Sequence, residues 1–127
     1  MFTYDHFEVG RTYGSDEFEI SQEVIGKWLA VYPDDDNGAW MPPGMTSMIQ
    51  LQAYINVITP RPKGNVHGSQ RFEMLRLPRV GERLLTAVSC THKEIRKERR
   101  WVETSYSTAG PDGSIAFKGV MTTLVAA

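Results

Sequence analysis

The chain has 127 residues, of which 41% are hydrophobic and 23% are charged, and its formal net charge at pH 7 is −1. This length supports one hydrophobic core, so we expect a single domain over residues 1–127. The near-zero charge argues against a nucleic-acid partner, because such surfaces normally carry a basic excess. The single cysteine, Cys90, excludes an internal disulfide and a cysteine-rich zinc site.

Nothing in the hydropathy pattern indicates export or a membrane. No apolar run approaches the length of a membrane span, and the first residues lack the hydrophobic stretch of a secretory signal. We therefore expect a cytoplasmic protein with no membrane partner. Cys90 lies in a strand-like run, where it is best interpreted as a small buried side chain.

The first quarter of the chain predicts a strand followed by a helix. Residues 1–14 are interpreted as a lead-in whose aromatic side chains pack on the body of the protein. Residues 17–20 alternate between acidic and apolar side chains, which is typical of a half-exposed strand. Ser21 is a favourable N-cap for the helix that follows, and Pro33 ends that helix.

A strongly apolar helix is predicted to end at about Ile58. It follows an acidic loop, a tryptophan and a Pro-Pro-Gly turn. Four apolar residues fall on one face at helical spacing: Met48, Leu51, Ile55 and Ile58. Three more apolar residues extend that face round the helix: Ile49, Ala53 and Val57. A helix this apolar needs a large partner surface, and the rest of the chain offers only strands for that purpose.

The turn before this helix is a candidate site for a carbonyl oxygen. Pro42 and Pro43 suit the entry to a helix, and Gly44 lets another group approach the free backbone N–H groups there. These donors and the helix dipole favour an oxygen that carries partial negative charge. The alternative is that the turn only leads into a core helix.

Strands are the only elements predicted after the proline-rich break at residues 59–64. We expect four, over residues 66–77, 82–97, 100–108 and from about 115 onwards. The charged run KEIRKERR is interpreted as the solvated tip of a hairpin, and residues 110–113 as the turn before the last strand. The expected class is α+β, with a long central apolar helix wrapped by a curled antiparallel sheet of about five strands.

This layout resembles the hot-dog fold, and the sequence is similar to the MaoC-like dehydratases, which include the (R)-specific enoyl-CoA hydratases. Three passages carry the resemblance: FEVGRTYGSDEFEISQEVIGKWLAVYPDD, MPPGMTSMIQL and NVHGSQRFEMLRLPRVGERL. They match the family opening, the start of its central helix, and the following strand with its turn. The last passage is the most specific, and together the three span most of the chain.

The resemblance implies hydration or dehydration of an acyl thioester, carried on CoA or on an acyl carrier protein, in fatty acid metabolism. In the family, an Asp and a His hold the water that adds across the enoyl double bond. A backbone N–H at the start of the central helix polarises the thioester carbonyl, where charge develops during the reaction. We expect no cofactor, and the three consecutive aspartates lack a well-spaced fourth ligand for a metal ion.

The family's hydratase motif, D-x-N-P-x-H, is only partly present. Asp35 and Asn37 fit the Asp and Asn positions, which implies that Asp35 is the base and that Asn37 positions the water or the loop. Trp40 stands where the catalytic His is expected. Gly44 or Met45 corresponds to the N–H donor. Alternatively, the three aspartates form a solvated acidic loop that caps nearby N–H groups.

Another histidine is a candidate to replace the missing one. His67 begins the strand after the central helix, although a histidine in that position is more often structural. Trp40 and Pro43 are expected to line the pocket.

Three functions remain open from the sequence. The first is an acyl-thioester hydratase or dehydratase with an incomplete Asp/His motif. The second is a non-catalytic acyl-thioester binding or regulatory subunit, which the missing histidine favours. The third is an acyl-CoA thioesterase, in which Asp35 alone activates water. Because hot-dog proteins generally pair exposed sheet edges, we expect a homodimer or a dimer of dimers.

Overall fold

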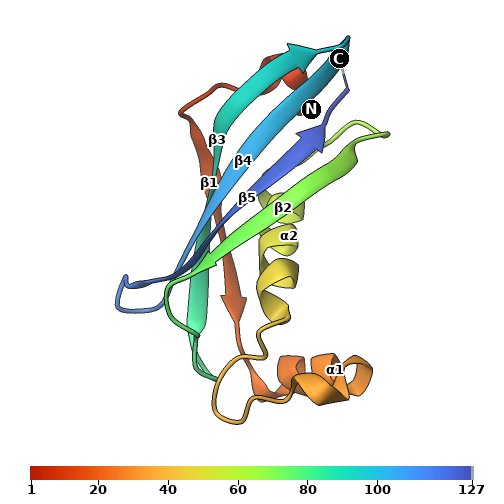
Figure 1. The fold of residues 1–127 in the computed structure, drawn as a ribbon. Coiled ribbons are helices and arrows are strands. Elements are labelled where there is room, and N and C mark those ends of the chain that lie inside the picture. Colours follow the sequence, from red (N-terminus) through yellow and green to blue (C-terminus); the bar gives the residue numbers. More distant parts are fainter. Residues whose placement is uncertain (127) are drawn as a thin grey trace.

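An antiparallel sheet of five strands curls around one side of a helix in the computed structural model, which describes residues 1–126 (Figure 1). The strand order across the sheet is β1-β3-β4-β5-β2. The strands are β1 (Thr12–Glu19), β2 (Val66–Met74), β3 (Arg83–Arg96), β4 (Arg99–Ala109) and β5 (Ile115–Leu124). The helices are α1 (Gln22–Val31) and α2 (Met45–Val57), with 3-10 turns at Tyr4–His6 and Pro33–Asp35. The predicted α+β architecture is confirmed.

The first strand is longer than the sequence predicted, because it begins inside the segment interpreted as a lead-in. Its register against β3 shifts between Thr12 and Gly14, where Gly14 has a φ of 153°. Apart from Tyr13, residues 12–16 are small or polar, so they carry no apolar alternation that would mark a strand. Their pairing with β3 nevertheless places them in the sheet.

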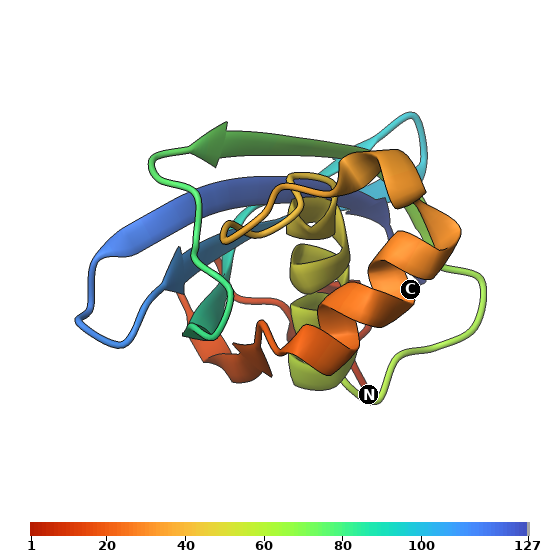
Figure 2. The same cartoon turned by 90° about the horizontal axis from the view of Figure 1, so that it is seen from below.

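Helix α2 buries only part of the predicted apolar face, which includes Ile58 at its end. The residues under the sheet include Met45, Ile49 and Ala53, whereas Leu51 and Ile55 remain 40% and 44% exposed. Figure 2 shows α2 from below, with the strands curving round one side of it. The sheet therefore covers only part of an apolar cylinder, and the predicted face is left partly in solvent.

A glutamine lies at the centre of the contact between α2 and the sheet. Gln50 is fully buried, and both polar atoms of its amide lack a partner among residues 1–126. The amide packs where β5 carries Gly119, and a Cβ at that glycine would overlap it. Gly119 thus makes room for a buried side chain.

The end of the molecule that carries α1 and the start of α2 has its own hydrophobic cluster. Ile20 and Ile25 flank the N-terminus of α1 and pack with Met45 and Phe117. The Ser21 hydroxyl accepts a hydrogen bond from the N–H of Val24 at 3.1 Å, which confirms the predicted N-cap. This cluster fixes the ends of both helices, and so it positions the loop between them.

Among the helices formed by residues 1–126, none combines the length and apolar character needed to cross a bilayer. Cys90 is fully buried, as predicted. The charged run forms the exposed turn between β3 and β4, where Lys97 and Glu98 have positive φ angles, and this confirms the predicted hairpin tip.

Candidate functional site

The loop between α1 and α2 brings the carboxylate of Asp35 to the start of α2. Its Oδ2 accepts a hydrogen bond from the indole Nε1 of Trp28 at 2.7 Å and from the backbone N–H of Gly44 at 3.2 Å. Asp35 and Gly44, two of the predicted site residues, therefore meet within hydrogen-bond distance. Asp36 accepts a hydrogen bond from the N–H of Gly38 at 3.1 Å. These are the contacts that the capping interpretation of the acidic loop expects.

The first N–H groups of α2 are already engaged by neighbouring atoms. The N–H of Gly44 donates to Asp35, the N–H of Met45 donates to the carbonyl of Pro42 at 3.0 Å, and Thr46 donates to Pro43 at 3.2 Å. The Met45 side chain is fully buried, while Pro43 is exposed. A thioester carbonyl can accept a hydrogen bond from the Gly44 N–H only if it displaces the Asp35 carboxylate or shares this N–H with it.

Only glycine fits position 44 without a rearrangement. A Cβ there would lie 2.8 Å from the Oδ2 of Asp35 and 3.0 Å from the Trp28 ring. We therefore expect Gly44→Ala to lower the free energy of unfolding by about 1–2 kcal/mol in urea denaturation. The matched control is Gly26→Ala in α1, where a Cβ meets nothing within 4 Å and a helical alanine should stabilise by about 0.5–1 kcal/mol. Equal effects at the two positions would contradict the close approach.

Asn37 and Trp40 hold the middle of the loop against the turn that precedes β3. The side-chain amide of Asn37 donates to the carbonyl of Met41 at 3.3 Å. Trp40 forms an isolated antiparallel bridge with Arg79, whose guanidinium carbon lies 4.7 Å from the centroid of the indole ring. The Trp40 side chain replaces the expected histidine with a group that has no base to offer. It remains 41% exposed at the wall of a cleft of roughly 790 Å³.

A half-buried ion pair forms another wall of this cleft. The Glu82 carboxylate accepts two hydrogen bonds from the Arg76 guanidinium, at 2.9 and 3.1 Å, and one from the N–H of Arg79 at 2.6 Å. The Arg76 hydrogen bonds hold the pKa of Glu82 below its ordinary value, although partial burial opposes them. The same pairing raises the pKa of Arg76.

This pair makes stability depend on acidity. Because the pKa of Glu82 is lower in the folded state than in the unfolded state, its contribution is complete above the unfolded value and is lost as the pH falls through the folded one. We expect Glu82→Gln to cost about 1–2 kcal/mol at pH 7 and to lessen the further loss on acidification. Glu23→Gln, which removes an ion pair with about four-fifths of each side chain exposed, is the control and should have little effect. Urea denaturation of the wild-type protein and the two variants at pH 7 and pH 3 measures how much stability each loses on acidification. An equal loss of unfolding free energy in all three proteins would contradict a stabilising role for the Glu82 carboxylate.

His67 lies at the other end of α2 from Asp35. It is exposed on β2, opposite Thr123 of β5, and lines a pocket that also contains Tyr54. A helix of 13 residues is about 20 Å long, so its two ends cannot share one water molecule. Within one chain, the structure brings Asp35 to Gly44 but keeps His67 away from both.

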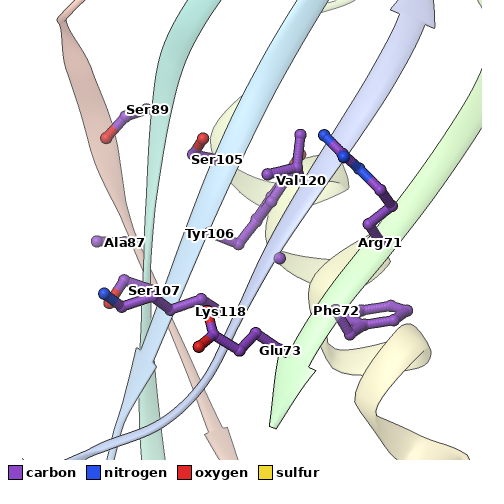
Figure 3. Close-up of a pocket in the computed structure, with 11 residues that line it drawn as sticks. Arg71, Phe72, Glu73, Ala87, Ser89, Ser105, Tyr106, Ser107, Lys118 and Val120 are labelled. Atoms are coloured by element: carbon purple, nitrogen blue, oxygen red, sulfur yellow. The ribbon is translucent and has the colours of Figure 1, made fainter. Parts of the chain in front are cut away.

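The opposite face of the sheet carries a separate hollow of roughly 620 Å³, shown in Figure 3 with α2 behind the strands. Its lining includes Ser89, Ser105 and Ser107 from β3 and β4. The longer side chains of Arg71 on β2 and Lys118 on β5 also line it. These residues alternate along their strands with side chains that face α2, such as Tyr106. The hollow is thus separated by the sheet from the start of α2.

Trp28 is the residue of this site whose contact with Asp35 the sequence did not indicate, because its position on the apolar side of the helix predicts core packing. Its indole N–H makes the shorter of the two hydrogen bonds to Asp35, and its ring stacks near Tyr32 with centroids 4.6 Å apart. A tryptophan on the inner face of a helix is usually a core residue, and α1 gave no local sign of a polar partner. The only signal was the spacing of seven residues across a helix end to an aspartate.

Known structures match the whole chain, although no family model and no curated protein sequence matches it. A MaoC-like dehydratase from Rhodospirillum rubrum aligns with a TM-score of 0.83 at 14% identity, covering 98% of this chain and 97% of that one. The (R)-hydratase PhaJ1 from Pseudomonas aeruginosa aligns with a TM-score of 0.78 at 18% identity, covering 98% of this chain and 85% of that one. HadBC, a 3R-hydroxyacyl-ACP dehydratase complex from Mycobacterium tuberculosis, aligns with a TM-score of 0.67 at 17% identity, covering 91% of this chain and 96% of that one. The chain therefore has the hot-dog fold of the MaoC-like dehydratases, as the resemblance implied.

Proposed function

We propose that the protein is an acyl-thioester hydratase or dehydratase of fatty acid metabolism that acts on an enoyl group carried by CoA or by an acyl carrier protein. The observation that carries the proposal is the meeting of the Asp35 carboxylate with the Gly44 N–H at the start of α2. The reaction needs both a base and a fixed donor for the carbonyl oxygen. Whole-chain similarity to dehydratases and an (R)-hydratase supports the same assignment.

In the proposed reaction, the thioester carbonyl replaces Asp35 as the acceptor of the Gly44 N–H. The carboxylate stays within reach because the shorter hydrogen bond from Trp28 still holds it. Asp35 takes a proton from water while the water oxygen bonds to the β-carbon of the enoyl group. The π electrons move to the carbonyl oxygen, where the donor and the helix dipole stabilise the enolate. Transfer of this proton from Asp35 to the α-carbon completes the addition.

The other predicted site residues take positioning roles in this proposal. Asn37 fixes the loop through the Met41 carbonyl, and Met45 anchors the helix start in the core. Trp40 and Pro43 form the exposed rim of the site. His67 lies in the pocket near the other end of α2 within its own chain, so it serves the reaction only if a second copy supplies it.

One specific observation favours a second function, a non-catalytic thioester-binding subunit. Asp35 satisfies the Gly44 donor, and Trp40 offers no proton-transferring group in place of the expected histidine. Such a subunit would keep the carbonyl site and perform no chemistry. A thioesterase differs from both, since water then attacks the carbonyl carbon and releases a thiol.

A spectrophotometric assay with crotonyl-CoA and a medium-chain enoyl-CoA separates the three functions. Loss of the enoyl absorbance without free thiol supports the hydratase. Release of free thiol identifies a thioesterase instead. No turnover together with measurable acyl-CoA binding identifies the binding subunit, and neither turnover nor binding rejects the acyl-thioester assignment.

We further propose that the protein is a cytoplasmic homodimer. Strand β2 is an unpaired sheet edge, and Phe72 and Met74 on it are 41% and 44% exposed. Leu51 and Ile55 of α2 are exposed to a similar extent, so an apolar surface borders an open edge. Light scattering at micromolar concentration should give at least twice the 14.3 kDa chain mass, and Leu51→Glu should reduce it toward the monomer. A monomeric wild-type protein would contradict this assembly.

A further inference from the structure

A small pocket lies at the end of α2 that is farthest from Asp35. It has a volume of roughly 260 Å³ and is lined by residues of α2, of the loop that follows it and of strands β2 and β5. Polar groups from four parts of the chain reach it: Tyr54, Arg61, Asn65, His67 and Thr123. None of the reaction steps proposed above uses these side chains.

Arg61 is held rigidly at this pocket. Its Nη1 donates to the carbonyls of Ile55 and Ile58, both at 2.7 Å, at the C-terminus of α2. Its guanidinium carbon also lies 5.4 Å from the centroid of the Tyr54 ring. The N–H groups on Nε and Nη2 have no hydrogen-bond partner among residues 1–126. A guanidinium fixed on one side and unpaired on the other is ready for an oxyanion.

A buried hydroxyl points to the same conclusion independently. Thr123 is only 5% exposed, it lines the pocket, and its Oγ1 has no partner within residues 1–126. Leaving a buried polar group unpaired is costly, so such groups normally have a partner. His67, which pairs with Thr123 across the β2–β5 ladder, adds a ring nitrogen to the pocket.

The charges around the pocket are positive. No carboxylate of residues 1–126 lines it, and Lys63 lies in the same loop as Arg61. The neighbouring hollow shares Gly64 with the pocket and is lined by Arg99 and Arg100, with Glu98 as its one acidic side chain in the described chain. This end is therefore basic although the whole chain has a formal net charge of −1.

We propose that this pocket binds a phosphate group. The free edge of Arg61 provides a planar pair of donors, the Thr123 hydroxyl adds a third, and the absence of lining carboxylates among the described residues avoids repulsion. Resting on the function proposed above, the phosphate is that of the phosphopantetheine arm, which CoA and acyl carrier proteins share. The length of α2, about 20 Å, is comparable with the reach of that arm between phosphate and thioester.

Isothermal titration calorimetry with 4′-phosphopantetheine and with pantetheine, which lacks the phosphate, tests the proposal. We expect phosphopantetheine to bind the wild-type protein about tenfold more tightly or better. Arg61→Gln and Thr123→Val should each reduce that advantage, whereas Arg79→Gln in the distant Trp40 cleft should preserve it. Equal affinities for the two ligands in the wild-type protein, or an advantage that survives Arg61→Gln, would overturn the phosphate site.

Two controls keep the outcome interpretable. Arg61 also binds the last carbonyls of α2, so Arg61→Lys and urea unfolding separate the loss of a phosphate contact from a loss of folding. Titration with 3′,5′-ADP shows which phosphate of CoA the pocket binds. If binding of 3′,5′-ADP depends on Arg61 and binding of phosphopantetheine does not, the pocket belongs to the nucleotide end of CoA. That result would overturn the phosphopantetheine assignment. If pantetheine binds and phosphopantetheine binds no more tightly, only the phosphate site is rejected, and the proposed function is left intact.

Discussion

Gly119→Ala is expected to lower the free energy of unfolding by about 2–3 kcal/mol, one of the largest effects of any single methyl group in this protein. The new Cβ would overlap the amide of Gln50, which is fully buried between α2 and β5. Because the interior is closely packed, the glutamine can move only by displacing its neighbours. Urea denaturation with a constant m-value measures the loss.

A double-mutant cycle identifies Gln50 as the cause. Gln50→Ala alone should also destabilise the protein, since it leaves a cavity beneath the sheet. Combined with Gly119→Ala, it should cost less than the sum of the two single effects, because the added methyl group then enters the vacated space. Additive losses would show that the two positions do not oppose each other.

Asp35→Asn is expected to reduce kcat/KM for an enoyl thioester by about 100-fold or more while changing stability little. The amide oxygen can still accept hydrogen bonds from Trp28 and Gly44, but it cannot take a proton from water. Steady-state kinetics with crotonyl-CoA and urea unfolding of the same preparation provide both values. Asp34→Asn is the matched control, since that side chain is exposed in the same loop and should leave both values unchanged.

Asp35→Ala separates the two roles further. It removes the carboxylate and also the cap on the Gly44 N–H, so it should lose the activity and about 1 kcal/mol of stability. An Asp35→Asn protein that keeps full activity would exclude Asp35 as the base. It would leave the residue with the capping role alone.

The architecture could be predicted because each element carried its own local signal. Ser21 and Pro33 bounded α1, the turn at residues 110–113 is closed by a hydrogen bond from Gly113 to Gly110, and the long strands alternated clearly. The start of β1 could not be predicted, because residues 12–16 lack apolar alternation and join the sheet only through pairing with a distant strand.

Which part of the predicted apolar face of α2 is buried could not be predicted, for a related reason. The helix is apolar almost all round, so periodicity does not say which side the sheet covers. Leu51 and Ile55 remain partly exposed, whereas the polar Gln50 is buried because Gly119 makes room for it. That pairing joins residues 69 positions apart, and no local pattern reveals it.

The candidate site was predictable in its members but not in its contacts. The helix-start glycine and the aspartate were identified from residue types and the family motif, and the fold brings these two together. The partner role of Trp28 depends on how α1 turns into the loop, and the isolation of His67 depends on the length and direction of α2. Distances of this kind arise only from the assembled fold.

Proton–nitrogen correlation spectra of the protein labelled with ¹⁵N-glycine, titrated with butyryl-CoA, test most directly whether the thioester binds at the start of α2. The saturated acyl group cannot be hydrated, so the complex persists during the measurement. We predict that the Gly44 amide shows the largest shift, because its hydrogen-bond acceptor changes from Asp35 to the thioester oxygen. Gly113, in the turn before β5, should remain in place. A Gly44 signal that does not move while butyryl-CoA binds would contradict the proposed site.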